Sequence, residues 1–173
     1  MANERLYREN VLFALAEPEA FADRTAPTAT ELNNSVLVHN ITCAIWEDKT
    51  EFTLGDPDTD TGLTFCSKAG VSDPTFDNPT VVYSALLDAD RTATGVFNEA
   101  RQLLSFADNE YIAILRIGKD SDVAFATDGS DEIKMVAVAT DYRVPEIGSG
   151  DNARITQTFL PKGWINWNYR VVA

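Results

Sequence analysis

Hydrophobic positions recur at steps of three and four residues in one stretch of the chain, residues 92–107. Side chains at this spacing share one face of an α-helix, so the pattern predicts a helix over about residues 93–107. Thr92 or Thr94 is suited to cap its start, and Asn109 is suited to the left-handed turn that ends it. The residues expected to face the core are Val96, Phe97, Ala100, Leu103, Leu104 and Ala107.

Most of the remaining chain alternates apolar and polar residues in short segments bounded by Gly, Pro, Asp and Asn, which is typical of β-strands. The expected strands cover residues 36–46, 63–66, 80–87, 111–117, 133–140, 153–160 and 165–171. Pro74, Pro79 and residues 161–163 are expected to form turns between strands. The alternation of the last strand places on one buried face Ile165, Trp167, Tyr169 and Val171. The sequence therefore predicts a mainly β fold, an antiparallel β-sandwich or barrel with one flanking α-helix.

The length of 173 residues is sufficient for one domain with a substantial core. We expect residues 36–173 to form a single β-sandwich domain. Residues 1–35 have one short apolar piece, at 11–16, among many Ala, Thr, Glu and Pro residues, and are expected to form an extended arm. Residues 47–62 are expected to form a long acidic loop or a splayed hairpin.

Acidic residues are concentrated in the middle of the chain. The formal net charge is −13, and residues 47–90 contain ten acidic residues against Lys49 and Lys68. Such a surface repels the phosphate backbone of nucleic acids, so tight DNA or RNA binding is disfavoured. An acidic surface also keeps a protein soluble, and solubility alone would explain the excess of acidic residues.

Few residues have the chemistry of a catalytic or metal site. His39 is the sole histidine and lies within an expected strand, where a structural role is favoured, and Cys43 and Cys66 are interpreted as small buried side chains. Residues 56–62 resemble a calcium-binding loop, but the glycine comes one position late and Ser67 stands where the closing Glu should be. We assign no catalytic, cofactor-binding or metal-binding residue and expect no enzyme activity and no cofactor.

The apolar run at 11–16 meets Glu17 and Pro18 after only six residues. A membrane-spanning helix needs roughly three times that length, and the core of a signal peptide is also longer. The sequence therefore predicts no membrane span and synthesis in the cytoplasm.

Four segments together resemble the major tail proteins, or tail tube proteins, of long-tailed, siphovirus-type bacteriophages, in particular those of actinobacterial phages. They are the opening at 4–16 (ERLYRENVLFALA), its Pro/Thr-rich continuation to residue 33, the single mid-chain helix, and the closing segment at 160–171 (LPKGWINWNYRV). The resemblance covers nearly the whole chain and concerns the order and the residue composition of its segments.

The resemblance implies a β-sandwich flanked by a helix, whose subunits form hexameric rings that stack into a hollow tube. DNA would pass through this tube during ejection without binding tightly. The partners implied are further copies of the chain and other tail proteins, such as the tape measure, terminator and distal tail proteins, and the implied location is the virion tail after synthesis in the host cytoplasm.

The arm at residues 1–35 and the acidic segment at residues 47–62 are expected to make the contacts between rings, because both are long and neither is expected to be part of the core. The self-assembly residues predicted from the acidic segment are Glu51, Phe52, Leu54, Asp56, Asp58 and Asp60, and those predicted from the arm are Val11, Leu12 and Phe13.

Alternatives from other protein classes remain open at this stage. A tail terminator or a head decoration protein would share the virion location. A carbohydrate-binding β-sandwich would stack sugars on exposed aromatic residues, for which the candidates are Trp46, Trp164, Trp167 and Tyr169, although alternating aromatics in a strand more often belong to a core.

Overall fold

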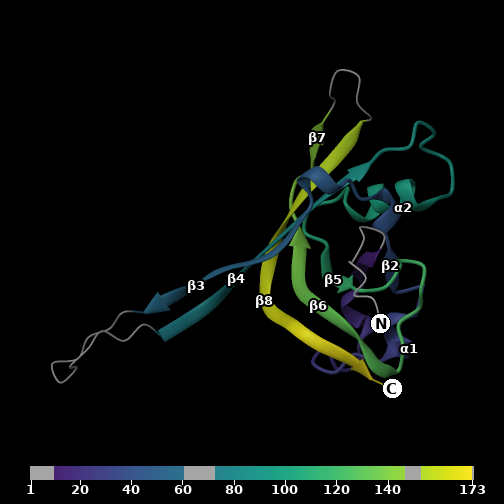
Figure 1. Ribbon diagram of the computed structural model, residues 1–173. Helices are drawn as coiled ribbons and strands as arrows, with labels where there is room; N and C mark the ends of the chain where they lie inside the picture. The colour runs from purple at the N-terminus through teal and green to yellow at the C-terminus, as the bar shows by residue number, and fades with distance from the viewer. Residues whose placement is uncertain (1–9, 61–72, 147–152, 173) are drawn as a thin grey trace, which may run out of the picture.

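The computed structural model describes residues 10–60, 73–146 and 153–172 (Figure 1). Its strands are β1 (Val11–Ala16), β2 (Val38–Asn40), β3 (Glu51–Asp60), β4 (Asp73–Leu86), β5 (Glu110–Ile117), β6 (Asp128–Thr140), β7 (Val144–Glu146) and β8 (Arg154–Val172). The helical segments are η2 (Pro18–Ala20), α1 (Ala29–Leu32), η3 (Thr42–Ala44), η4 (Glu47–Lys49) and α2 (Val96–Leu103). The mainly β fold predicted from the sequence is confirmed.

All of the strand pairs are antiparallel, and the strands follow the order β2-β1-β5-β6-β8-β4-β3, with β7 also paired to β8. The long strand β8 belongs to both halves of this sheet. Residues 154–158 pair with β4, whereas residues 159–172 pair with β6. Because β8 curves along its length (Figure 1), the β3-β4 half turns out of the plane of the β1-β5-β6 half, which gives a sandwich-like arrangement.

The layer formed by β1, β5 and β6 is buried on both faces, which explains the continuous apolar run in β5. Ile112 and Ile114 belong to a cluster with residues of the N-terminal segment, such as Phe21. Tyr111 and Ala113 point to the other cluster, which contains residues of β4, β8 and α2. A strand that is covered on both sides has no polar face, so its sequence shows no alternation.

The predicted helix is present, but it begins later than residue 93. Thr92 donates hydrogen bonds from its backbone N–H (2.9 Å) and its hydroxyl (2.7 Å) to Oδ1 of Asp90. This local turn competes with helix formation, and α2 starts only after Gly95, which provides no side-chain cap. Capping by Thr92 or Thr94 was therefore a wrong prediction.

The helix also ends earlier, with Leu104 as its C-cap. Asp108, not Asn109, adopts the left-handed conformation, with φ of 64°. On the face expected to cover the core, Ala100 and Leu104 are fully buried, and the partly buried residues packed on the same cluster include Val96, Phe97 and Leu103. Ala107 lies beyond the end of α2.

The N-terminal range 1–35, expected to be an extended arm, is folded against the sheet wherever it is described. β1 pairs with β5 on one side and with β2 on the other. The short helix α1 has a capping box, in which Thr28 accepts a hydrogen bond from the N–H of Glu31 and the Glu31 carboxylate accepts one from the N–H of Thr28. This second α-helix was missing from the prediction.

The strand expected over residues 36–46 stops at Asn40. Oδ1 of Asn40 accepts hydrogen bonds from the N–H and the hydroxyl of Thr42, a local turn that leads the chain into η3. The expectation of an extended strand beyond residue 40 was therefore wrong. The strand expected at 63–66 lies outside the described residues.

Prolines that were expected to break strands are instead inside them. Pro79 pairs with Leu54 and Pro74 pairs with Thr59 within the β3-β4 hairpin. Among the described strands, this part of β4 pairs with β3 alone, and proline is tolerated on a strand with one free edge. At residues 161–163, β8 also continues, with Gly163 at φ of 73° and shifts in the register of the pairing with β6.

Candidate assembly surface

The β3-β4 hairpin projects from the body of the molecule (Figure 1). Residues 51–60 of β3 pair with residues 73–82 of β4, whereas β8 pairs with β4 only from Val82 onward. Along the projecting part, β3 and β4 pair only with each other among the described strands, so each has one edge without a partner. The sequence left open a long acidic loop or a splayed hairpin over residues 47–62. After the short η4 turn, residues 51–60 instead form one strand, β3, whose partner is β4, and residues 61 and 62 lie outside the described residues.

The described surface of this hairpin is polar and acidic. Glu51, Asp56, Asp58 and Asp77 are all exposed, and Leu54 has 39% of its surface exposed. Nδ2 of Asn78 donates to the backbone oxygen of Asp56 (2.9 Å) and to Oδ1 of Asp58 (3.2 Å). These bonds hold the two strands together at the irregular pairing that follows Gly55, where a β-carbon on that glycine would lie 3.2 Å from the Asn78 oxygen.

The base of the hairpin is anchored on the body through an aromatic pair. Phe52 stacks on Trp167 of β8, with ring centroids 5.7 Å apart and an interplanar angle of 28°. Nζ of Lys134 lies 4.9 Å from the Trp167 ring centroid. The contact fixes the direction in which the hairpin leaves the body. Among the predicted assembly residues, Phe52 therefore serves first as an intramolecular anchor.

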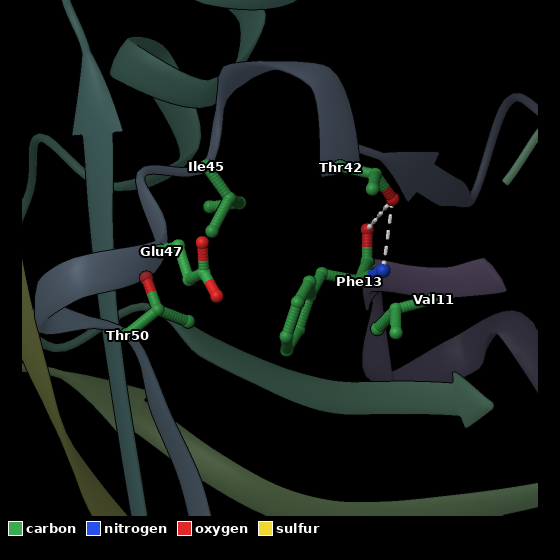
Figure 2. Close-up of a pocket in the computed structure, with 6 residues that line it drawn as sticks. All are labelled: Val11, Phe13, Thr42, Ile45, Glu47 and Thr50. Atoms are coloured by element: carbon green, nitrogen blue, oxygen red, sulfur yellow. Dashed lines mark hydrogen bonds between the residues drawn. The ribbon is translucent and has the colours of Figure 1, made fainter. Parts of the chain in front are cut away.

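The structure separates the three predicted residues of the N-terminal segment. Leu12 is only 3% exposed and belongs to the core. Val11 and Phe13 are half-buried and line a surface hollow of about 310 Å³. In Figure 2, Phe13 and Ile45 point into this hollow from opposite sides, and Thr42 closes one end through hydrogen bonds with the Phe13 backbone. Val11 and Phe13 thus lie near the surface, whereas Leu12 does not.

A second hollow, of about 550 Å³, was missed by sequence reasoning. It lies where β4 ends, and three basic side chains line it, those of Arg91, Arg101 and Arg143. They come from the segment after β4, from α2 and from the segment before β7. No local sequence pattern brings three such distant arginines together, so only the fold reveals the cluster.

The aromatic residues considered for sugar stacking do not form one platform. All four are partly buried; Trp164 and Tyr169 pack on one core cluster and Trp167 on the other. The prediction that Trp167 and Tyr169 share a face was wrong. The register with β6 shifts between Asn166 and Tyr169, and such a bulge reverses the alternation of side chains.

The remaining candidates for chemistry have structural contacts or lie outside the described residues. Nδ1 of His39 lies 2.8 Å from Oε1 of Glu99 and links β2 to α2. Cys43 is exposed and has a free thiol, which corrects its predicted burial, whereas Cys66 is outside the described residues. In the part of the chain that the structure describes, no three His, Cys, Asp or Glu side chains gather as a metal site. Among the same residues, no helix has the length and apolar character needed to cross a membrane.

Comparison with known proteins identifies a family over the full chain. The matching family model is described as phage tail tube protein, and the match covers residues 1–173. No curated protein matches the chain.

Proposed function

Because the chain belongs to the phage tail tube protein family, we propose that its subunits close into rings, six to a ring, which stack into the hollow tube that carries DNA during ejection. The chain is a structural component of a virion tail. In the proposal it is made in the host cytoplasm, and it meets the tape measure, terminator and distal tail proteins at the ends and inside of the tube.

The observation that carries this proposal is the projecting β3-β4 hairpin. An exposed strand edge is a template for pairing with another chain, and a lone polar ribbon buries too little surface to be useful to an isolated subunit. A contact between different surfaces of two copies closes into a ring if its rotation closes, and a second contact along the axis extends the ring into a filament. The hairpin supplies a surface for such contacts.

Residues from both predicted segments enter the proposed assembly contacts. The hairpin contributes Glu51, Leu54 and Asp56, with Asp58 and Asp60, to the contact between rings. Val11 and Phe13 add an apolar contribution at the hollow of Figure 2, because half-buried apolar side chains become more stable when a neighbour covers them. Leu12 is already buried and is left out of the contact.

The acidic charge has a role in this proposal. Six copies of a chain with formal net charge −13 carry −78 formal charges in one ring. If part of that charge lines the bore, it repels DNA phosphates and prevents the genome from adhering to the wall. Tight DNA binding by the assembled protein at moderate ionic strength would contradict this part of the proposal.

The test is a variant with a shortened hairpin. Thr53 and Thr80 pair directly, so residues 54–79 are replaced by Asn-Gly, which closes a two-residue turn between paired strands. The Phe52–Trp167 stack remains, and the variant should fold. We expect circular dichroism and thermal melting to show a folded subunit, and negative-stain microscopy to show no tubes. Tubes of normal length from this variant would refute the proposed role of the hairpin, with the unmodified chain as the control.

A further inference from the structure

The arginine hollow, defined here by Arg91, Arg101 and Arg143, is unusual in a chain with 27 acidic and 14 basic residues. Four other basic side chains in the described residues are paired with carboxylates: Lys49 and Arg154 with Glu146, Lys119 with Asp131, and Lys162 with Glu110. Arg116 and Lys134 lie over the rings of Phe125 and Trp167. Within the described residues, none of the three guanidinium groups of the hollow has an ion pair. Positive charge is therefore concentrated at this place.

The contacts of the three side chains leave most of their donors available. Nε of Arg101 donates to Oδ1 of Asn98 (3.2 Å), and Nη1 of Arg143 donates to Oγ of Ser105 (2.8 Å). These bonds orient two of the guanidinium groups with neutral partners. One carboxylate, that of Asp88, also lines the hollow, so the lining has three positive charges and one negative charge. Guanidinium groups arranged in this way bind carboxylates through paired, charge-assisted hydrogen bonds.

The acidic hairpin and the arginine hollow lie at opposite ends of one strand. β4 begins in the projecting hairpin at Asp73 and ends at Leu86, just before the hollow (Figure 1). Its 14 residues span about 45 Å. The hairpin presents exposed carboxylates at Asp56 and Asp77, and the hollow presents cations. Each subunit thus has two complementary surfaces facing away from each other, which suits a head-to-tail contact.

We propose that the hairpin carboxylates of one subunit bind in the arginine hollow of a second copy of this chain. This inference rests on the proposed function, because it supplies the surface that receives the hairpin from the next ring. The contact joins different surfaces of the two copies and repeats along an axis, so it extends a filament without limit.

Charge reversal tests this docking on the full chain. One variant reverses the hollow, with Arg91→Glu and Arg143→Glu, and another reverses the hairpin, with Asp56→Lys and Asp77→Lys. All four side chains are exposed, so both variants should fold. Alone, each variant places like charges at the contact and should form no tubes. Mixed in equal amounts, they restore opposite charges at every contact, and sedimentation and negative-stain microscopy should show assembly.

The matched control reverses two basic side chains that line a different hollow, with Arg24→Glu and Lys162→Glu. It has the same net charge as the hollow variant. It should form tubes alone, and when it is mixed with the hairpin variant, sedimentation of the tubes should leave the hairpin variant in the supernatant.

The outcomes separate the docking from the proposed function. Tubes of normal length from the hollow variant would overturn the docking but would leave the proposed tube function intact. The same conclusion would follow if each variant failed to assemble alone and their mixture also stayed dispersed. If the unmodified chain forms no tubes, the proposed function fails. Association of the two variants only on mixing, seen as an increase in sedimentation coefficient, would then still support the docking, and its absence would overturn the docking.

Discussion

Replacing Tyr83 with phenylalanine should stabilise the folded subunit. Tyr83 is fully buried in β4, and its hydroxyl has no hydrogen-bond partner among the described residues. Its ring packs edge to face against Phe13 and Phe159, with centroid distances of 5.5 Å and 5.3 Å. The ring therefore packs β4 against β1 and β8, whereas the buried hydroxyl has, within the described part of the chain, no hydrogen bond to replace those it would make with water. Phenylalanine keeps the ring and removes the hydroxyl.

The magnitude follows from the burial of the hydroxyl. A buried polar group without a partner costs roughly 1–3 kcal/mol, so Tyr83→Phe should raise the free energy of unfolding by about that amount at neutral pH. A chain of this size gains about 2–4 °C in melting temperature for each kcal/mol. Tyr83→Ala removes the ring as well and should lower the free energy of unfolding by roughly 3–5 kcal/mol.

The same burial makes the difference between the two proteins depend on pH. Burial raises the pKa of the Tyr83 hydroxyl above its usual value. The stabilisation linked to the neutral hydroxyl is complete below the unfolded-state pKa, about 10, and is lost as the pH rises toward the folded-state pKa. Above about pH 10, the wild-type chain should therefore lose about 1.4 kcal/mol per pH unit relative to Tyr83→Phe.

The assay is urea unfolding at pH 7 and at several values above pH 10, at a protein concentration where sedimentation shows dispersed subunits. Tyr142→Phe is the matched control, because Tyr142 is 84% exposed and the substitution should change the free energy of unfolding by less than about 0.5 kcal/mol. A Tyr83→Phe variant that is less stable than the wild-type chain at pH 7 would show that the hydroxyl has a partner, and the reasoning would fail.

Three further predictions concern the fold. Hydrogen bonds from the N–H groups of Ala22 and Thr28 hold the pKa of Glu31 below its usual value. The stability contributed by the ionised Glu31 is present above the usual pKa and is lost as the pH falls. Glu31→Gln should therefore flatten the acid side of the stability–pH curve measured by urea unfolding. Leu12→Ala should lower the free energy of unfolding by roughly 2–5 kcal/mol in the same assay; a loss below 1 kcal/mol would contradict the core position. Phe52→Ala should lower it by about 1 kcal/mol and shift Trp167 emission to longer wavelength, and unchanged emission would argue against the stack.

The elements predicted correctly from the sequence have patterns set by one nearby surface. The steps of three and four in α2 arise because one side of the helix covers the core cluster that contains Ala100 and Leu104. β5 was predicted as a strand because its residues are apolar and β-branched over a length suited to a sheet buried on both sides. Both signals are local and can be read without knowing the partners of these elements.

The errors arise where the conformation depends on local hydrogen bonds or on register. The turn at Asn40 depends on its side chain bonding to Thr42, which a count of apolar residues does not detect. The separation of Trp167 and Tyr169 onto different faces depends on a shift in the register between β8 and β6. Strict alternation in the sequence predicts one shared face, and only the bulge reveals two.

The candidate assembly surface was only partly predictable for a related reason. Residues 51–60 have no continuous apolar face, because the hairpin projects away from the core, so the sequence could not distinguish a hairpin from a loop. The burial of Leu12 follows from the position of β1 inside the sheet. The three arginines of the hollow lie far apart in the chain, and the fold alone brings them together.

Negative-stain microscopy of the purified chain at increasing concentration tests the central claim most directly. The account predicts hollow tubes of uniform diameter whose number and length rise with concentration. Subunits that remain single at every concentration would contradict the claim that this chain completes its exposed hairpin with copies of itself.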